Sequence, residues 1–182
     1  MKKILKRGAE KGFTLLETVI AMAVLSFGIL TLASFYTQGV KASYTSQIQF
    51  IAQEKAQEAL ETIFTARDTQ MLSFAQIANV SQGGVFLDGP QPLLAPGPDG
   101  LVGTADDDTT NPDSIVVGPG PDNVLGTADD IRINLNPWMT RTIAFTPVNG
   151  TPNLNQITVT INYKYQGKNY SFTLTTYISN YA

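Results

Sequence analysis

The chain has 182 residues and a formal net charge of −3, and it contains neither Cys nor His. It therefore lacks the usual donors for zinc, copper, haem and iron–sulfur sites, and it lacks the residues of the common triads, so the composition disfavours an enzyme. Residues 1–12 carry five Lys or Arg against one Glu, whereas the remainder carries seven Lys or Arg against fourteen acidic residues. An acidic body lacks the clustered Lys and Arg of a nucleic-acid groove, so no nucleic-acid partner is predicted.

A long apolar segment follows the basic residues. Residues 18–36 are nineteen uncharged residues, close to the ~20 that a helix needs to cross the hydrocarbon core. The basic flank predicts that the N-terminus stays in the cytoplasm. Glu17 is the fifth residue of the apolar stretch that starts at Phe13, where an unpaired carboxylate is costly in lipid and so needs a partner. A secretory signal cleaved near Ala21 or Ala33 and a plain single-span anchor are the two simpler interpretations.

One short stretch has a specific pattern, Lys11-Gly12-Phe13-Thr14-Leu15-Leu16-Glu17. Together with the basic leader and the apolar segment, it resembles the class III signal of type IV prepilins and type II secretion pseudopilins. The resemblance implies that a membrane prepilin peptidase cuts between Gly12 and Phe13, and that Phe13 becomes the methylated amino terminus. It also implies that Glu17 faces the terminal ammonium of a neighbouring subunit, which would neutralise both charges inside an apolar bundle.

The resemblance also indicates the kind of subunit. The Thr-Leu-Leu-Glu start, Gly28 within the apolar segment and the Thr-rich end of the chain are most similar to minor pilins of the V type and to the corresponding minor pseudopilins. Many major pilins carry a Pro early in the mature helix, whereas this chain has none between Phe13 and Gln70. Small residues that permit close helix approach recur in the segment, at Ala21, Ala23, Gly28 and Ala33.

Beyond Tyr36 the composition becomes amphipathic. Apolar residues recur at spacings of three and four, at Ile48, Ile51, Ala52, Ala56, Ala59, Leu60 and Ile63. We therefore expect one helix from Phe13 to about Ala66, with a transmembrane or assembly part over residues 13–40 and the spine of a head within residues 41–78. A separate soluble helix after a break at Gly39 is the alternative.

Residues 79–130 have the composition of a loop, since they hold nine of the ten Asp, seven of the ten Pro and nine of the fifteen Gly, with no Lys or Arg. Two copies of one motif lie inside, GPDGLVGTADD at 97–107 and GPDNVLGTADD at 120–130. Such turns can fold carboxylates around a hard cation, so calcium is the predicted ligand. The candidate ligands are Asp99, Asp106, Asp107, Asp122, Asp129 and Asp130. A solvated acidic repeat without metal is the alternative.

Residues 131–182 predict an antiparallel β-sheet. The alternating pattern of residues 156–182 predicts a hairpin that turns at 166–169, and further strands are expected at 131–135 and 141–147. The apolar face, with Trp138 and Phe145 nearby, should pack on helix residues 48–63. The expected fold class is α+β and pilin-like: a long N-terminal helix, half transmembrane and half amphipathic, packed on a small C-terminal antiparallel sheet.

These features together predict a single-pass inner-membrane protein with a periplasmic head that enters a type IV pilus or a type II secretion pseudopilus as a minor structural subunit. The partners implied by the resemblance are the prepilin peptidase, other pilin or pseudopilin subunits, the inner-membrane assembly platform and membrane lipid. Ca²⁺ is the expected cofactor. The alternative function is a membrane-anchored or secreted calcium-binding module. The sequence leaves open whether the system serves a pilus, secretion or DNA uptake.

Overall fold

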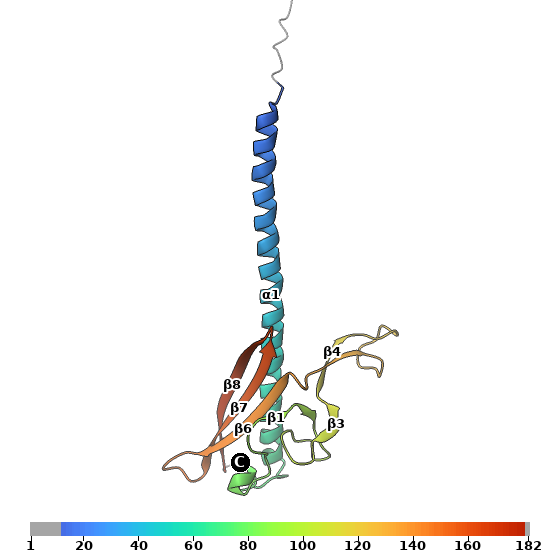
Figure 1. Ribbon diagram of the computed structural model, residues 1–182. Helices are drawn as coiled ribbons and strands as arrows, with labels where there is room; N and C mark the ends of the chain where they lie inside the picture. The colour runs from blue at the N-terminus through green and yellow to red at the C-terminus, as the bar shows by residue number, and fades with distance from the viewer. Residues whose placement is uncertain (1–11, 181–182) are drawn as a thin grey trace, which may run out of the picture. The chain divides into compact units, whose positions relative to one another are not determined.

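A computed structural model describes residues 12–180, so the leader before Gly12 and the end of the chain at Ala182 lie outside the described residues (Figure 1). The long helix α1 comprises Leu15–Asp68, 54 residues. It continues without interruption through Gly28 and Gly39, so the alternative of a break at Gly39 is wrong. Without a Pro in the segment, each of these glycines weakens the helix by only about 1 kcal/mol relative to Ala.

The helix ends at Asp68, close to the expected end at about Ala66, so residues 69–78 of the segment assigned to the spine are not helical. After Asp68 the chain enters the left-handed region at Gln70, with φ of 59°. The Gln70 N–H donates to the Arg67 carbonyl at 2.9 Å, and the Leu72 N–H donates to the Ala66 carbonyl at 3.1 Å. A left-handed residue that returns such bonds to the last turn stops a helix, and residues 71–78 form turns instead.

The chain divides into two compact units, residues 1–46 and 47–182, and the second contains a four-stranded antiparallel sheet. Its order is β1-β6-β7-β8, with β1 at Gln91–Pro92, β6 at Met139–Pro147, β7 at Leu154–Tyr165 and β8 at Lys168–Ser179. The turn between β7 and β8 is Gln166-Gly167, and both residues have positive φ, 48° and 78°. That is the geometry of a two-residue hairpin turn, so the predicted hairpin and the predicted strand at 141–147 are confirmed.

The core of this second unit lies between the helix and the sheet. The helix contributes mainly alanines, which let the sheet approach closely, and the sheet contributes larger side chains. Buried members of the cluster include Ala52, Ala56, Ala59, Ile63, Ile143, Phe145, Ile157, Val159 and Ile161. The predicted packing of the sheet on helix residues 48–63 is therefore confirmed, and the fold is α+β and pilin-like, as expected. Phe145 is buried, whereas Trp138 is only half-buried.

Residues 79–130 contain more regular structure than expected. A 3-10 turn, η1, comprises Val80–Gln82, and two separate antiparallel pairs follow. Strand β2 at Leu94–Ala95 pairs with β3 at Asp108–Pro112, and β4 at Ser114–Gly118 pairs with β5 at Ile131–Asn134. Each pair is a hairpin whose loop is one copy of the duplicated motif. The expectation that the strand at 131–135 joins the C-terminal sheet is wrong, because this strand, β5, pairs with β4 in a separate sheet instead.

Candidate assembly site

The start of α1 is capped by Thr14, whose capping role was not predicted from the sequence. The Glu17 N–H donates to Thr14 Oγ1 at 3.3 Å, and Thr18 Oγ1 donates to the Thr14 carbonyl at 3.0 Å. Thr14 therefore acts as the N-cap, and Glu17 lies in the first turn, where a carboxylate interacts favourably with the helix dipole. A Thr followed three residues later by Glu is the capping-box pattern, which could have identified Thr14 from the sequence.

Gly12 and Phe13 lie in non-helical chain just before this cap. The Phe13 side chain is 81% exposed, and a Cβ added to Gly12 would meet no atom within 4 Å. The bond between the two residues is thus outside the helical hydrogen-bond network and is open to an enzyme. The structure places Gly12, Phe13 and Glu17 within one short stretch at the helix start, while their roles in cleavage, methylation and assembly stay predictions.

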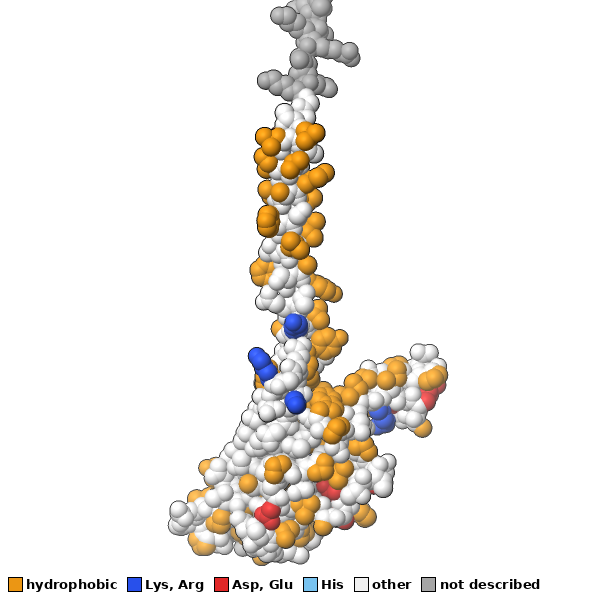
Figure 2. Space-filling model, viewed as in Figure 1, with side chains coloured by type: hydrophobic (Ala, Val, Ile, Leu, Met, Phe, Trp, Pro, Cys, Tyr) orange, Lys and Arg blue, Asp and Glu red, His pale blue; other side chains and the backbone are white. Residues whose placement is uncertain are grey.

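The N-terminal part of α1 leaves its apolar side chains uncovered (Figure 2). In the described chain α1 is the one helix that is long and apolar enough to cross a membrane, and none of its most apolar window is buried. Exposed large side chains occur on all sides of the helix, among them Leu16, Ile20, Val24, Phe27, Leu30 and Phe35. Such a surface requires lipid or other apolar helices around it.

The two copies of the acidic motif adopt the same local structure. Asp99 Oδ1 accepts the Leu101 N–H at 2.8 Å, and in the second copy Asp122 Oδ1 accepts the Val124 N–H at 2.9 Å. The equivalent bonds from Gly103 to Asp107 Oδ2 and from Gly126 to Asp130 Oδ2 are both 2.8 Å. Thr104 Oγ1 donates to Asp106 Oδ1 at 2.8 Å, and Thr127 Oγ1 donates to Asp129 Oδ1 at 2.7 Å. Each Asp of the motif therefore caps a backbone or hydroxyl group of its own loop.

Glycine closes each loop at its base. A Cβ on Gly97 would collide with the backbone carbonyl of Asp106, and one on Gly120 would collide with that of Asp129. No side chain fits where two backbone segments approach this closely. The first Gly of each copy thus allows the two ends of the hairpin loop to come into contact, and hydrogen bonds within the loop stabilise it.

The carboxylates of the two loops differ in their electrostatic environment. Hydrogen bonds from Thr104 and Thr127 lower the pKa of Asp106 and of Asp129, respectively. Burial raises the pKa of Asp107. Within residues 12–180 no group of three or more acidic side chains is arranged to hold a metal ion. Calcium binding by the six Asp of the motif stays a prediction.

A charged cluster joins the junction of the two hairpins to the helix. Lys55 Nζ lies 2.8 Å from Asp113 Oδ2 and 2.7 Å from Glu58 Oε2, and the Lys55 and Asp113 side chains are only 13% and 11% exposed. Asp113 is the residue between β3 and β4. Arg141 on β6 is buried, which lowers its pKa, while Glu58, Asp107 and Asp113 act on it electrostatically in the opposite direction. This cluster fixes the junction of the hairpins to the spine.

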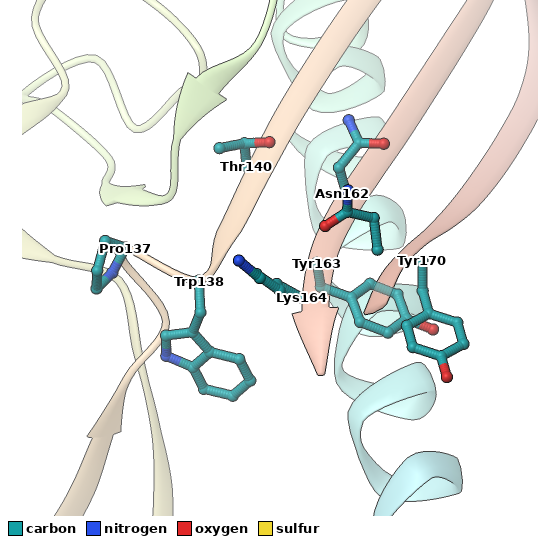
Figure 3. Close-up of a pocket in the computed structure, with 8 residues that line it drawn as sticks. Pro137, Trp138, Thr140, Asn162, Tyr163, Lys164 and Tyr170 are labelled. Atoms are coloured by element: carbon teal, nitrogen blue, oxygen red, sulfur yellow. The ribbon is translucent and has the colours of Figure 1, made fainter. Parts of the chain in front are cut away.

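A shallow hollow of about 310 Å³ lies at one end of the sheet (Figure 3). The rings of Tyr163 and Tyr170 stack there, 5.6 Å apart at 14°. Trp138 and Lys164 also line it, and the Trp138 indole N–H donates to the Asn134 carbonyl at 2.6 Å. These aromatic residues pack against the edge of the core.

One comparison with known protein families agrees with the N-terminal pattern. A family model described as the prokaryotic N-terminal methylation motif matches residues 7–33, which include Gly12, Phe13 and Glu17. No curated protein and no solved structure matches the chain. The motif implies, in general terms, a prepilin peptidase and other pilin subunits as partners, and it fits membrane anchoring through α1. This motif, at the start of a long helix that carries an antiparallel sheet, supports a type IV pilin-like or pseudopilin-like protein.

Proposed function

We propose that the chain is a minor structural subunit of a type IV pilus or a type II secretion pseudopilus, cleaved after Gly12 and methylated at Phe13. The observation that carries this proposal is the uncovered apolar surface of α1, which lies largely within the methylation motif. Lipid covers this surface before assembly, and the equivalent helices of neighbouring subunits cover it in a filament. The minor rather than major role rests on the resemblance of the Thr-Leu-Leu-Glu start and the Thr-rich hairpin to minor subunits.

The chemistry of assembly would centre on Glu17. Cleavage creates an amine on Phe13 that is largely positive at neutral pH, since an α-amino group has a pKa of about 7.7–8.0. Glu17 is exposed on the first turn, so its carboxylate can meet the amine of an adjacent subunit. Pairing these groups avoids leaving either charge alone in an apolar bundle.

The proposed topology follows from the positive charge that precedes the apolar segment. Five Lys or Arg precede it in residues 1–12, which would keep the N-terminus in the cytoplasm and place the head in the periplasm. The inner-membrane assembly platform and the surrounding lipid are then the further partners of the anchored form.

Processing is tested with Gly12→Val in cells that make the filament. Because a Cβ at residue 12 would meet no atom within 4 Å, the change should leave the structure intact and block only the peptidase. We expect wild type to yield a mature chain that starts at N-methyl-Phe13 by mass spectrometry, and the variant to stay as a membrane-held precursor. A wild-type mature terminus near Ala21 or Ala33 would refute the proposal.

The counterion role is tested separately with Glu17→Gln, which keeps the size of the side chain and removes its charge. We expect normal cleavage but strongly reduced incorporation into filaments, because the proposed partner of Glu17 arises only after cleavage. Glu61→Gln is the matched control, since Glu61 is an exposed acid on the head part of the same helix. Equal incorporation of both variants would exclude an intersubunit role for Glu17.

A further inference from the structure

The two copies of the acidic motif share one local fold but have different surroundings. In the first copy, the apolar pair Leu101 and Val102 is buried, with exposures of 3% and 0%. In the second copy, the equivalent Val124 and Leu125 are 54% and 66% exposed. Because the Asp side chains at equivalent positions accept equivalent hydrogen bonds in both copies, the loop fold itself does not explain the difference. The head contains a pocket that buries the apolar pair of the first copy, whereas no part of the described chain covers the apolar pair of the second copy.

The first copy shows what such a pocket contains. Val102 and Leu101 belong to the core cluster of the head, and Ile143 Cδ1 lies against Gly103. The Gly103 carbonyl accepts the Leu87 N–H at 2.8 Å. This pocket therefore provides an apolar surface from the sheet and one backbone N–H, that of Leu87, at its edge. A partner for the second copy needs the same two features.

The hairpin that carries the second copy, residues 114–134, presents further apolar surface. Figure 1 shows it as a separate ribbon beside the main sheet of the head. Exposed apolar side chains along it are Val116, Val117, Val124, Leu125, Ile131 and Ile133. A two-stranded ribbon of this kind has too little core to be stable in water by itself. Clustered apolar surface on a hairpin marks an interaction site.

From these observations we propose that residues 114–134 form a docking arm, which inserts Val124 and Leu125 into the head of a different pilin-like subunit. The arm is acidic, with Asp122, Asp129 and Asp130 against Arg132, so the receiving pocket should be apolar with Lys or Arg at its rim. An anionic membrane surface would repel the same tip. In this chain the equivalent pocket is already filled by the first copy, which disfavours a second copy of the chain as the partner. The proposal rests on the proposed function, since it takes the neighbour to be a filament subunit.

Photocrosslinking of the full chain in cells tests the docking arm. The photoreactive residue p-benzoylphenylalanine replaces Leu125 in one variant and Val80 in the control, because Val80 is an exposed apolar residue of the head at 50%. We expect residue 125, but not residue 80, to crosslink to a chain that carries its own N-terminal methylation motif. A product containing only a second copy of this chain, lipid or a protein of another class would overturn the proposal, and so would no product above the control.

A second pair of variants measures the effect on assembly. Val124→Ser with Leu125→Ser should reduce incorporation into filaments at least about tenfold, whereas Val80→Ser should leave incorporation unchanged. Both should retain cleavage after Gly12 and wild-type unfolding by Trp138 fluorescence, since the altered side chains are exposed. If the serine pair is incorporated like wild type, the docking arm is refuted. If the wild-type chain is absent from filaments, the proposed function fails, and crosslinking at residue 125 in the membrane still decides the docking arm.

Discussion

The ion pair between Lys55 and Asp113 offers a quantitative test of how the hairpins are held to the helix. Lys55→Met keeps most of the length of the side chain and removes its charge. The variant leaves Asp113, 11% exposed, without the cation that hydrogen-bonds to it. Breaking a fully buried pair costs about 3–5 kcal/mol, and we expect about 3 kcal/mol here because the site is slightly open to water. For a head of this size that corresponds to a fall in unfolding temperature of roughly 10 °C.

The measurement uses the full chain in detergent micelles, with denaturant unfolding followed through Trp138, the single Trp of the sequence. A double-mutant cycle with Asp113→Asn isolates the pair. We expect the double variant to recover much of the loss, because Asn needs no counterion. Lys164→Met, at an exposed Lys, is the control and should change stability by less than about 0.5 kcal/mol.

The pH dependence has a definite sign. Burial alone would lower the pKa of Lys55, but hydrogen bonds to Asp113 and Glu58 outweigh it and raise the pKa above 10.5. The stabilisation should therefore be complete at neutral pH and be lost only as the pH rises through the raised pKa. A cost below about 1 kcal/mol for Lys55→Met, or strictly additive effects in the cycle, would refute the reasoning.

Three further predictions concern the acidic hairpins. Gly97→Ala should lower the stability of the head by about 1–3 kcal/mol, because its Cβ collides with the Asp106 carbonyl in a loop packed on the core. Gly120→Ala should instead disturb the exposed hairpin and leave Trp138-monitored unfolding nearly unchanged. Equal effects of the two changes on stability would contradict the different surroundings of the two copies. Hydrogen bonds from Thr110 and Asn111 lower the pKa of Asp108 to about 2, so carboxyl NMR should find it ionised down to that pH, and Thr110→Val should raise its pKa. If the motif binds calcium, millimolar Ca²⁺ should raise the unfolding temperature and protect residues 97–130 from protease, and Asp106→Asn with Asp129→Asn should abolish both responses; no response in wild type would exclude the site.

The sequence predicted best where one physical signal dominated. The charge-free segment after Glu17 and the spacing of Ala52, Ala56 and Ala59 predicted the helix and its buried face, because helical periodicity is a local property. Strict alternation in residues 156–178 similarly predicted the hairpin β7–β8. The methylation motif is a short linear pattern, so its recognition needed no knowledge of the fold.

Prediction failed where pairing partners decided the structure. The strands β3 and β4 were not expected, because β3 has the sequence DTTNP and the segment around both is dominated by Gly, Pro and Asp. The Gly, Pro and Asp residues of the loops dominate the composition of residues 79–130. Composition alone cannot predict that a pair of short strands closes each of the two loops. The partner of Ile131–Asn134 was misassigned for the same reason, since strand pairing depends on chain order and space as well as on alternation.

The energetics of assembly suggest how the two uncovered surfaces divide their roles. Lipid chains are as apolar as the side chains of α1, so moving this helix from the membrane into a filament yields little hydrophobic gain. The helix can therefore tolerate many neighbours, and its selectivity would come from the paired charges at Glu17. Val124 and Leu125 instead leave water when they bind, which yields about 1–2 kcal/mol for each half-exposed side chain. A small contact made in water can thus discriminate among subunits whose membrane helices are nearly equivalent, and this argues that choice of neighbour is decided in the head.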